Sequence, residues 1–194
     1  MNNDLGDSDS LQNSPDKKKN KTFVVWFTGL SGSGKTTVSE QLKLTLLNKG
    51  ISSVIFDGDT MRKGISKDLG FSDEDRKENI RRTAEMAHLV ALSGVCAICA
   101  LISPFVPDRQ AAREILSDYN FIEVFVDTPL EVCEQRDAKG FYKKARIREI
   151  LDFTGIDSIY EKPVNPEIRI STDGATTEEN IETILNFLKA KKLL

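Results

Sequence analysis

Few cysteines, a single histidine and the lack of a long apolar run exclude several classes of protein. Three cysteines, an odd number among 194 residues, do not make a disulfide framework, so we expect a reducing, cytoplasmic compartment. His88 is the one histidine, and it lies in a helix-like stretch without a set of metal ligands around it. No apolar run reaches the length that spans a membrane, and the acidic first residues lack the apolar core of a secretory signal.

The charge of the chain is nearly balanced, with 27 basic and 30 acidic residues and a net charge of −3. This balance argues against a general nucleic-acid binder, and an anionic substrate must be met by local positive charge. Residues 1–20 contain two leucines and no aromatic residue, so we expect a disordered tail. Residues 21–194 suffice for one compact domain with a sizeable core, but not for a second.

Cys96 and Cys99 form a C-x-x-C pair inside the apolar run over residues 95–102. Residues three apart in a strand point to opposite faces. A redox pair would instead lie at the start of a helix, where the thiol pKa is lowered. We therefore predict two buried core cysteines.

Residues 29–36 read Gly-Leu-Ser-Gly-Ser-Gly-Lys-Thr and match the pattern G-x-x-x-x-G-K-[ST] of a phosphate-binding loop. An apolar run, 22–28, precedes the loop, and a helical pattern, 36–49, follows it. Glycines let backbone N–H groups surround phosphate oxygens, and the helix N-terminus adds partial positive charge. Lys35 would reach the β- and γ-phosphates, and the Thr36 hydroxyl would ligate Mg²⁺. The predicted ATP-binding residues are Gly29, Ser31, Gly32, Ser33, Gly34, Lys35, Thr36 and Thr37.

Short apolar runs alternate with helical patterns along the rest of the chain. We expect strands over residues 23–27, 54–56, 95–102, 122–126 and 168–170, and long helices over 73–93 and after Thr176. Ser72 and the Thr176/Glu179 capping box favour the helix starts, and Gly94 favours a stop. Such strands predict a parallel sheet covered on both faces. The fold class is therefore α/β, a P-loop NTPase-type three-layer sandwich, with residues 137–166 expected to form a mobile lid.

Two carboxylates, Asp57 and Asp59, follow the second expected strand. Ligands of an open parallel sheet bind outside the carboxyl ends of its strands, so these side chains should face the phosphate loop. Phosphoryl transfer to a hydroxyl needs the acceptor oriented, its proton accepted and Mg²⁺ held. One aspartate would serve the hydroxyl and the other the water shell of the metal. A polar Asp-Gly turn is the alternative.

A set of basic residues then surrounds one aromatic and one amide side chain. The set comprises Arg62, Lys63, Phe71, Arg76, Asn79, Arg81 and Arg82. Such a cluster is usually a solvated helix face. Beside a nucleotide crevice it can be an acceptor site, in which Arg binds an anion and Phe stacks on a base.

Taken together, many motifs in order resemble the adenylyl-sulfate kinase (APS kinase) family. They are residues 29–36, 57–59, 68–72, 75–76, 78–82, 102–104, 121–129, 139–140, 142–146 and 153–157, within a match from about 22 to 173. The resemblance implies a P-loop kinase of sulfate assimilation. Such enzymes use MgATP to phosphorylate the 3′-hydroxyl of adenosine 5′-phosphosulfate (APS), giving 3′-phosphoadenosine 5′-phosphosulfate and ADP.

The resemblance also implies roles for individual residues. Catalysis would involve Lys35, Asp57 and Asp59, with Mg²⁺ held by Thr36 and, through water, by Asp57. The acceptor site would be lined by Asp59, Arg62, Phe71, Arg76, Asn79, Ile102, Ser103, Lys139 and Phe153, with Phe71 and Phe153 on either side of the adenine. The family pattern labels Ser103 a phosphoserine intermediate. Because direct in-line transfer needs no covalent enzyme, we expect acceptor hydrogen bonding there instead.

Some positions depart from the family pattern, namely Thr60, Phe105, Val106 and residues 147–152. These differences leave the fine substrate contacts and the lid kinetics open. As partners we expect the small molecules ATP and APS and a second copy in a homodimer, with no nucleic acid and no membrane.

Three other functions are compatible with parts of the pattern. Another small-molecule kinase would keep the phosphate loop and Asp59 without needing Phe71 or Asn79. A GTP-dependent switch needs an N-K-x-D motif, which neither Asn-Lys pair, at 20–21 and 48–49, completes. A catalytically dead nucleotide sensor would not need to retain Lys35 and Asp57.

Overall fold

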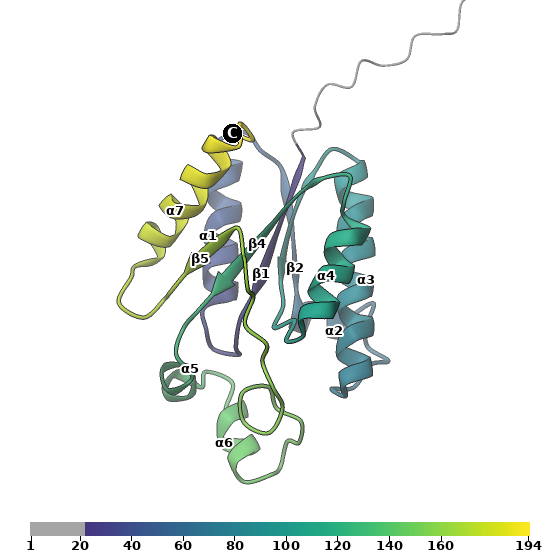
Figure 1. The fold of residues 1–194 in the computed structure, drawn as a ribbon, viewed down its shortest axis with the longest axis vertical. Helices are drawn as coiled ribbons and strands as arrows, with labels where there is room; N and C mark the ends of the chain where they lie inside the picture. Colours follow the sequence, from purple (N-terminus) through teal and green to yellow (C-terminus); the bar gives the residue numbers. More distant parts are fainter. Residues whose placement is uncertain (1–21) are drawn as a thin grey trace, which may run out of the picture.

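The computed structural model describes residues 22–194, and the tail expected over residues 1–20 lies outside the described residues. Five strands of this part form one parallel sheet in the order β2-β3-β1-β4-β5 (Figure 1). The strands are β1 (Phe23–Thr28), β2 (Ser53–Asp57), β3 (Cys96–Ala100), β4 (Asn120–Val126) and β5 (Ile168–Ile170). The helices are α1 (Lys35–Leu47), α2 (Gly58–Lys63), α3 (Asp73–Leu92), α4 (Val106–Ile115), α5 (Leu130–Arg136), α6 (Phe141–Arg146) and α7 (Thr177–Ala190).

Successive residues of β1 point to opposite faces of the sheet and build two cores. On one face Val25 packs with Leu42 of α1 and Ile184 of α7. On the other face Trp26 packs with Ala84 of α3. Figure 1 shows α1 and α7 on one side of the sheet and α3 and α4 on the other. The predicted three-layer α/β sandwich is confirmed, and burial of β1 on both faces explains its continuous apolar run.

The two cysteines of β3 confirm the alternation. Cys96 belongs to the core beneath α1 and α7, whereas Cys99 belongs to the core beneath α3. Both are free thiols, and burial raises the pKa of each. They are core residues, as predicted, and not a redox pair.

The long helices begin at the predicted caps. The Ser72 hydroxyl accepts the N–H of Asp75 at 3.2 Å, and Thr176 and Glu179 form a capping box. Gly94 follows α3 with a φ of 80°, in the left-handed region that favours glycine. Strand β3 is shorter than the run predicted over 95–102. Its pairing with β1 ends at Ala100, beyond which Leu101 and Ile102 make single backbone hydrogen bonds to Phe27 and Gly29.

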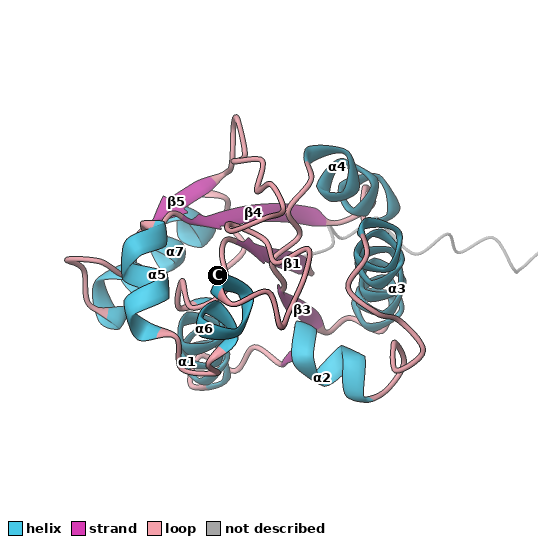
Figure 2. Cartoon of the chain, turned by 90° about the horizontal axis from the view of Figure 1, so that it is seen from below, coloured by secondary structure: helices cyan, strands magenta, loops and turns pink. Residues whose placement is uncertain are grey.

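The carboxyl ends of the strands lie beside α2, α5 and α6, and Figure 2 views the molecule from this end. A third, smaller core joins Cys133 of α5, Tyr142 and Ala145 of α6, and Phe153. The segment predicted as a lid therefore contains a helix and packs on a core of its own, and its motion stays a prediction.

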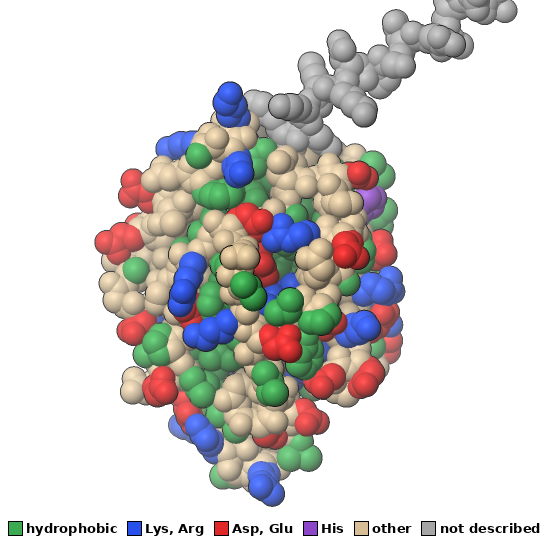
Figure 3. All heavy atoms as spheres, viewed as in Figure 1, with side chains coloured by type: hydrophobic (Ala, Val, Ile, Leu, Met, Phe, Trp, Pro, Cys, Tyr) green, Lys and Arg blue, Asp and Glu red, His purple; other side chains and the backbone are tan. Residues whose placement is uncertain are grey.

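The described surface is mixed in charge, and Figure 3 shows Lys and Arg side chains interspersed with Asp and Glu on the face in view. Among residues 22–194, no helix has both the length and the apolar character needed to cross a membrane.

Candidate active site

The phosphate-binding loop connects the end of β1 to the start of α1. Gly32 and Gly34 have φ angles of 73° and 96°, which favour glycine. A Cβ atom at Gly32 would lie 2.9 Å from the carbonyl oxygen of Cys133, and one at Gly34 would lie 2.8 Å from Cγ2 of Thr172. The loop therefore needs glycine at these positions both for its conformation and for space.

Two threonines at neighbouring strand ends hold the back of this loop. The Ser33 carbonyl accepts the hydroxyl of Thr128, after β4, at 3.1 Å and that of Thr172, after β5, at 2.8 Å. Arg136 of α5 donates to the Thr172 hydroxyl at 2.6 Å and to the Gly32 carbonyl at 3.3 Å. Sequence analysis missed Thr128, Thr172 and Arg136. The sequence feature that could have indicated the two threonines is that each closely follows a predicted strand.

Lys35 lies inside the loop that it belongs to. Its Nζ donates to the carbonyls of Gly29 at 2.9 Å and Leu30 at 2.7 Å, and the residue is only 8% exposed. Burial lowers the pKa of Lys35 to about 8, while the Asp57 carboxylate opposes this shift. The ammonium group of Lys35, which is predicted to bind phosphate, is therefore held by backbone carbonyl oxygens in this structure.

The predicted metal-binding pair is brought together. The Thr36 hydroxyl donates to Oδ2 of Asp57 at 3.1 Å. The other oxygen of Asp57 accepts the N–H groups of Asp59 at 3.1 Å and Thr60 at 3.3 Å and so caps α2. Residues 22–194 contain no cluster of three or more metal-ligating His, Cys, Asp or Glu side chains. A hydroxyl and a carboxylate nonetheless fit Mg²⁺, which keeps several waters and takes other ligands from substrate phosphates.

Asp59 of α2 forms an ion pair with Lys139, which lies between α5 and α6. Both side chains are about half exposed, so the pair lies at the surface of the site. The structure thus joins a predicted catalytic carboxylate to the segment predicted as a lid.

The predicted acceptor residues Arg62, Phe71 and Arg76 form a second group. The Arg62 guanidinium lies over the Phe71 ring, 4.5 Å from its centroid, and that of Arg76 lies at 5.9 Å. Arg76 donates to the Phe71 carbonyl at 2.9 Å and to the Asp152 carbonyl at 2.8 Å. Burial lowers the pKa of both arginines. Arg76 therefore connects the Phe71 loop to the residue before Phe153.

The two aromatic residues predicted to enclose the adenine differ in exposure. Phe71 is 56% exposed, whereas Phe153 is 7% exposed and packs edge-on against Tyr142, with ring centroids 4.9 Å apart. Tyr142 in turn donates to the Ser31 carbonyl of the phosphate loop at 2.9 Å. The ring of Phe153 is therefore largely covered in this state, and the ring of Phe71 is open to solvent.

Asn79, Ile102 and Ser103 complete the predicted set. Asn79 is 4% exposed, and its Oδ1 is buried without a hydrogen-bond partner among the described residues. Ile102 is half-buried. Ser103 is 2% exposed, and its hydroxyl oxygen accepts the indole N–H of Trp26 at 3.2 Å.

Comparisons with known proteins assign the chain to a family. The adenylylsulphate kinase family model matches residues 21–171. The adenylyl-sulfate kinase of Clostridium acetobutylicum is 51% identical over 183 residues, which make up 94% of this chain and 91% of that protein.

Solved structures of APS kinases are also similar to this chain. The Mycobacterium tuberculosis APS kinase CysC, in complex with AMPPNP and APS, is 46% identical with a TM-score of 0.84, and the match covers 87% of this chain and 98% of that one. A hexameric APS kinase from Thiobacillus denitrificans is 29% identical with a TM-score of 0.68, and the match covers 89% of this chain and 30% of that one. The chain belongs to the adenylylsulphate kinase family.

Proposed function

We propose that this chain transfers the γ-phosphoryl group of ATP to the 3′-hydroxyl of APS, as a kinase of sulfate assimilation. One observation carries the proposal: in a chain of this family, a phosphate loop and an arginine–aromatic group lie at the carboxyl ends of the same sheet. Both substrates are nucleotides: ATP would bind at the phosphate loop, and APS at the arginine–aromatic group. Phosphates would bind to backbone N–H groups and Lys35, and the adenosine phosphosulfate to arginine and aromatic side chains.

On the ATP side, the phosphate loop would surround the phosphates and Lys35 would leave the loop carbonyls for the β- and γ-oxygens. Thr36 and, through water, Asp57 would hold Mg²⁺, whose charge offsets that of the transferring group. The eight residues proposed to bind ATP are Gly29, Ser31, Gly32, Ser33, Gly34, Lys35, Thr36 and Thr37.

Asp59 is the proposed acceptor of the 3′-hydroxyl proton. A carboxylate can accept a proton from a bound hydroxyl, and the ion pair with Lys139 holds that of Asp59 at the exposed surface of the site. Transfer is then direct and in line, from ATP to the acceptor oxygen. A covalent intermediate on Ser103 would need an exposed, activated hydroxyl, whereas this hydroxyl is buried beside an indole N–H. Ser103 is therefore proposed to act in acceptor binding.

The acceptor APS would bind between the segment that carries Arg62, Phe71 and Arg76 and the segment that carries Phe153. Arg62 and Arg76 would meet the phosphosulfate, and Phe71 and Phe153 would enclose the adenine. A buried amide oxygen without a partner is costly, so a ribose hydroxyl or adenine N–H donated to Asn79 would be stabilising. The full proposed set is Asp59, Arg62, Phe71, Arg76, Asn79, Ile102, Ser103, Lys139 and Phe153.

We extend the proposal to the lid, the assembly and the compartment. Residues 137–166 would close over both nucleotides and exclude water, which competes with the acceptor hydroxyl. The chain would act as a homodimer in the cytoplasm, where its three buried cysteines stay reduced. Light scattering of the purified chain distinguishes a dimer from the hexamer seen in the relative from Thiobacillus denitrificans.

The test is ATP turnover with and without APS, with the nucleotide products separated by chromatography. We expect ADP and 3′-phosphoadenosine 5′-phosphosulfate in equal amounts, and very slow ATP hydrolysis without the acceptor. Adenosine 5′-phosphate and a simple sugar serve as alternative acceptors. Turnover with either of these and none with APS would assign the chain to another kinase reaction.

A further inference from the structure

The loop after β3 carries Ile102 and Ser103, and Ser103 has an unfavourable backbone conformation. Ser103 has a φ of 38°, in the left-handed region that costs a non-glycine residue free energy, and Pro104 follows it. Such a conformation persists only where the surrounding structure determines it, and it is found most often at functional sites. The contacts that hold this loop therefore bear on the acceptor site.

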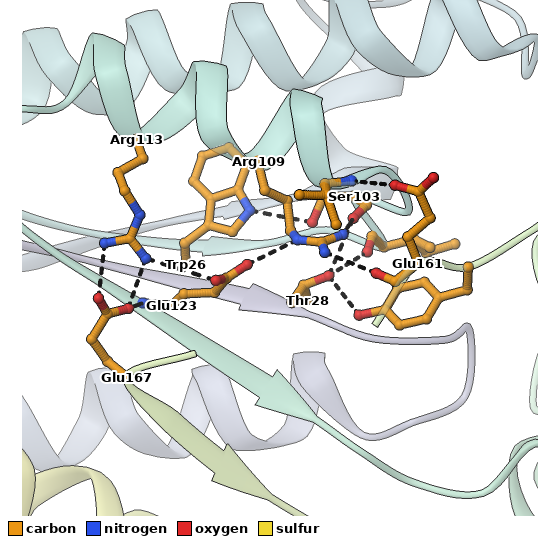
Figure 4. A network of polar contacts seen from close by, with 11 residues as sticks. Trp26, Thr28, Ser103, Arg109, Arg113, Glu123, Glu161 and Glu167 are labelled. Carbon is orange, nitrogen blue, oxygen red and sulfur yellow. Dashed lines mark hydrogen bonds and ion pairs between the residues drawn. The ribbon is translucent and has the colours of Figure 1, made fainter. Parts of the chain in front are cut away.

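Arg109 of α4 makes the charged contact to this loop (Figure 4). Its Nη1 donates to the Ser103 carbonyl at 2.7 Å, and the residue is 4% exposed. Trp26 donates to the Ser103 hydroxyl at 3.2 Å, and Thr28 donates to the Ile102 carbonyl at 2.7 Å. A hydrogen bond from a charged donor is about twice as strong as one from a neutral donor. Arg109 is thus the strongest single restraint on Ser103.

A buried ion pair fixes the arginine itself. Nε of Arg109 lies 2.8 Å from Oε1 of Glu123 on β4, and Glu123 is 8% exposed. Burial raises the pKa of Glu123, and the Arg109 charge opposes that rise. Arg113, one turn along α4, lies 3.7 Å from Glu123 and pairs with Glu167 at 2.8 Å. Figure 4 shows these side chains in one row between α4 and the sheet.

The same guanidinium reaches the segment that follows Phe153. Nη2 of Arg109 donates to the Glu161 carbonyl at 2.8 Å. The Glu161 N–H donates to the Pro104 carbonyl at 2.9 Å, and its carboxylate accepts the Val106 N–H at 2.7 Å. One side chain therefore joins the loop that carries Ile102 and Ser103 to the segment that follows Phe153, two parts of the chain that are far apart in the sequence.

We propose that Arg109 is a positioning residue for the acceptor. Through Ser103 and Glu161 it sets where the 3′-hydroxyl lies relative to Asp59 and the γ-phosphate, and the inference thus rests on the proposed function. This positioning role requires the planar guanidinium, because its N–H groups donate in three directions, to the Glu123 carboxylate and to the Ser103 and Glu161 carbonyls. A lysine can keep the charge beside Glu123, but it cannot bridge both carbonyls.

The test compares Arg109→Lys with Arg113→Lys. Arg113 is a matched control, because it belongs to the same helix and the same ion-pair row but contacts neither Ser103 nor Glu161 in the described contacts. For Arg109→Lys we expect kcat/KM for APS to fall by about tenfold to a hundredfold, the usual result of misplaced reacting groups. The KM for ATP should stay within about twofold, since Arg109 makes no described contact to the phosphate loop. Equal losses in the two variants, or equal effects on ATP and APS, would overturn the proposal.

Thr28→Val and hydrogen exchange test the positioning role independently of the Arg109→Lys kinetics. Thr28→Val removes the hydroxyl contacts to the Ile102 and Ser103 carbonyls and to Tyr160, and it leaves the buried Arg109–Glu123 ion pair intact. It should therefore also lower kcat/KM for APS. Hydrogen exchange of residues 101–105 and 160–162 should rise together in Arg109→Lys and not in Arg113→Lys. This measurement needs no substrate, so it holds even if APS is not the acceptor. Unchanged exchange in Arg109→Lys would refute the positioning role.

Discussion

Lys35 should make ATP binding depend on pH above about 8. Its ammonium group is buried in the free protein and donates to carbonyl oxygens of its own loop. Burial lowers its pKa from 10.5 to about 8; the largest charge effects come from Cys133 and Asp57, which raise it, and Lys139, which lowers it. Bound phosphates place several negative charges beside the same nitrogen and favour its protonated form. ATP binding should therefore raise the pKa of Lys35.

The sign and size of the effect follow from this shift. Well below pH 8 the lysine is protonated before ATP binds, so the affinity should be independent of pH there. At pH 9 about nine tenths of the free protein carries neutral Lys35 if its pKa is about 8. Binding should then take up about 0.9 proton, and the Kd for ATP should rise about tenfold, or about 1.4 kcal/mol, for each further pH unit.

Calorimetry between about pH 7.5 and 9.5, in buffers of different ionisation enthalpy, measures both quantities. Phosphate groups stay ionised throughout, because their second pKa is near 6. Burial raises the pKa of Cys133, and the charge of Lys35 opposes that rise. Lys139→Met removes a charge that lowers the pKa of Lys35, so the break should move to higher pH. A constant Kd with no proton uptake at pH 9 would refute the proposed role of the buried lysine.

Four further predictions concern catalysis, the acceptor and the lid. Asp59→Asn should lower kcat by on the order of a hundredfold or more, the usual contribution of acid–base catalysis, and normal kcat would exclude Asp59 as the base. Ser103→Ala should keep substantial turnover; complete loss with intact folding and acceptor binding would favour a phosphoserine instead. Phe71→Ala should weaken APS binding by about 1–3 kcal/mol and leave ATP affinity nearly unchanged, whereas the reverse pattern would place Phe71 at the ATP. Hydrogen exchange over residues 137–166 should slow when ADP and APS bind together, and equal protection with and without ligands would mean a fixed wall.

The fold and the phosphate loop could be predicted from local sequence patterns. The apolar run before Gly29 and the Gly-Lys-Thr ending act through backbone geometry, which neighbouring residues determine. The same holds for the cap at Ser72, whose hydroxyl meets a backbone N–H three residues on. The short helices α2, α4, α5 and α6 were not delimited, because 6 to 10 residues hold too little helical period to measure.

Contacts between distant segments could not be predicted in this way. Thr172 supports the phosphate loop through Ser33, and Arg109 of α4 pairs with Glu123 of β4. Each partner is ordinary in its own stretch of sequence, and only the strand order brings the two together. The covered ring of Phe153 has the same origin, because Tyr142 lies beside it through the packing of α6 and not through sequence spacing.

The expected lid is fastened unevenly, and this bears on how it can move. Its first part, residues 137–157, packs on the small core of α5 and α6 and reaches the acceptor side through the exposed Lys139–Asp59 ion pair and the hydrogen bond from Arg76 to the Asp152 carbonyl. An exposed pair of this kind opens at little free-energy cost. From Tyr160 onward the chain is bound to the sheet and α4, with Tyr160 at 2.8 Å from the Thr28 hydroxyl and Glu161 held by Arg109. Disrupting the buried pair behind Arg109 would cost on the order of 3–5 kcal/mol. Within the lid of residues 137–166, residues 137–157 should therefore move most on closure and residues from Tyr160 onward least, so that Phe153 changes partners while the Ser103 loop stays in place.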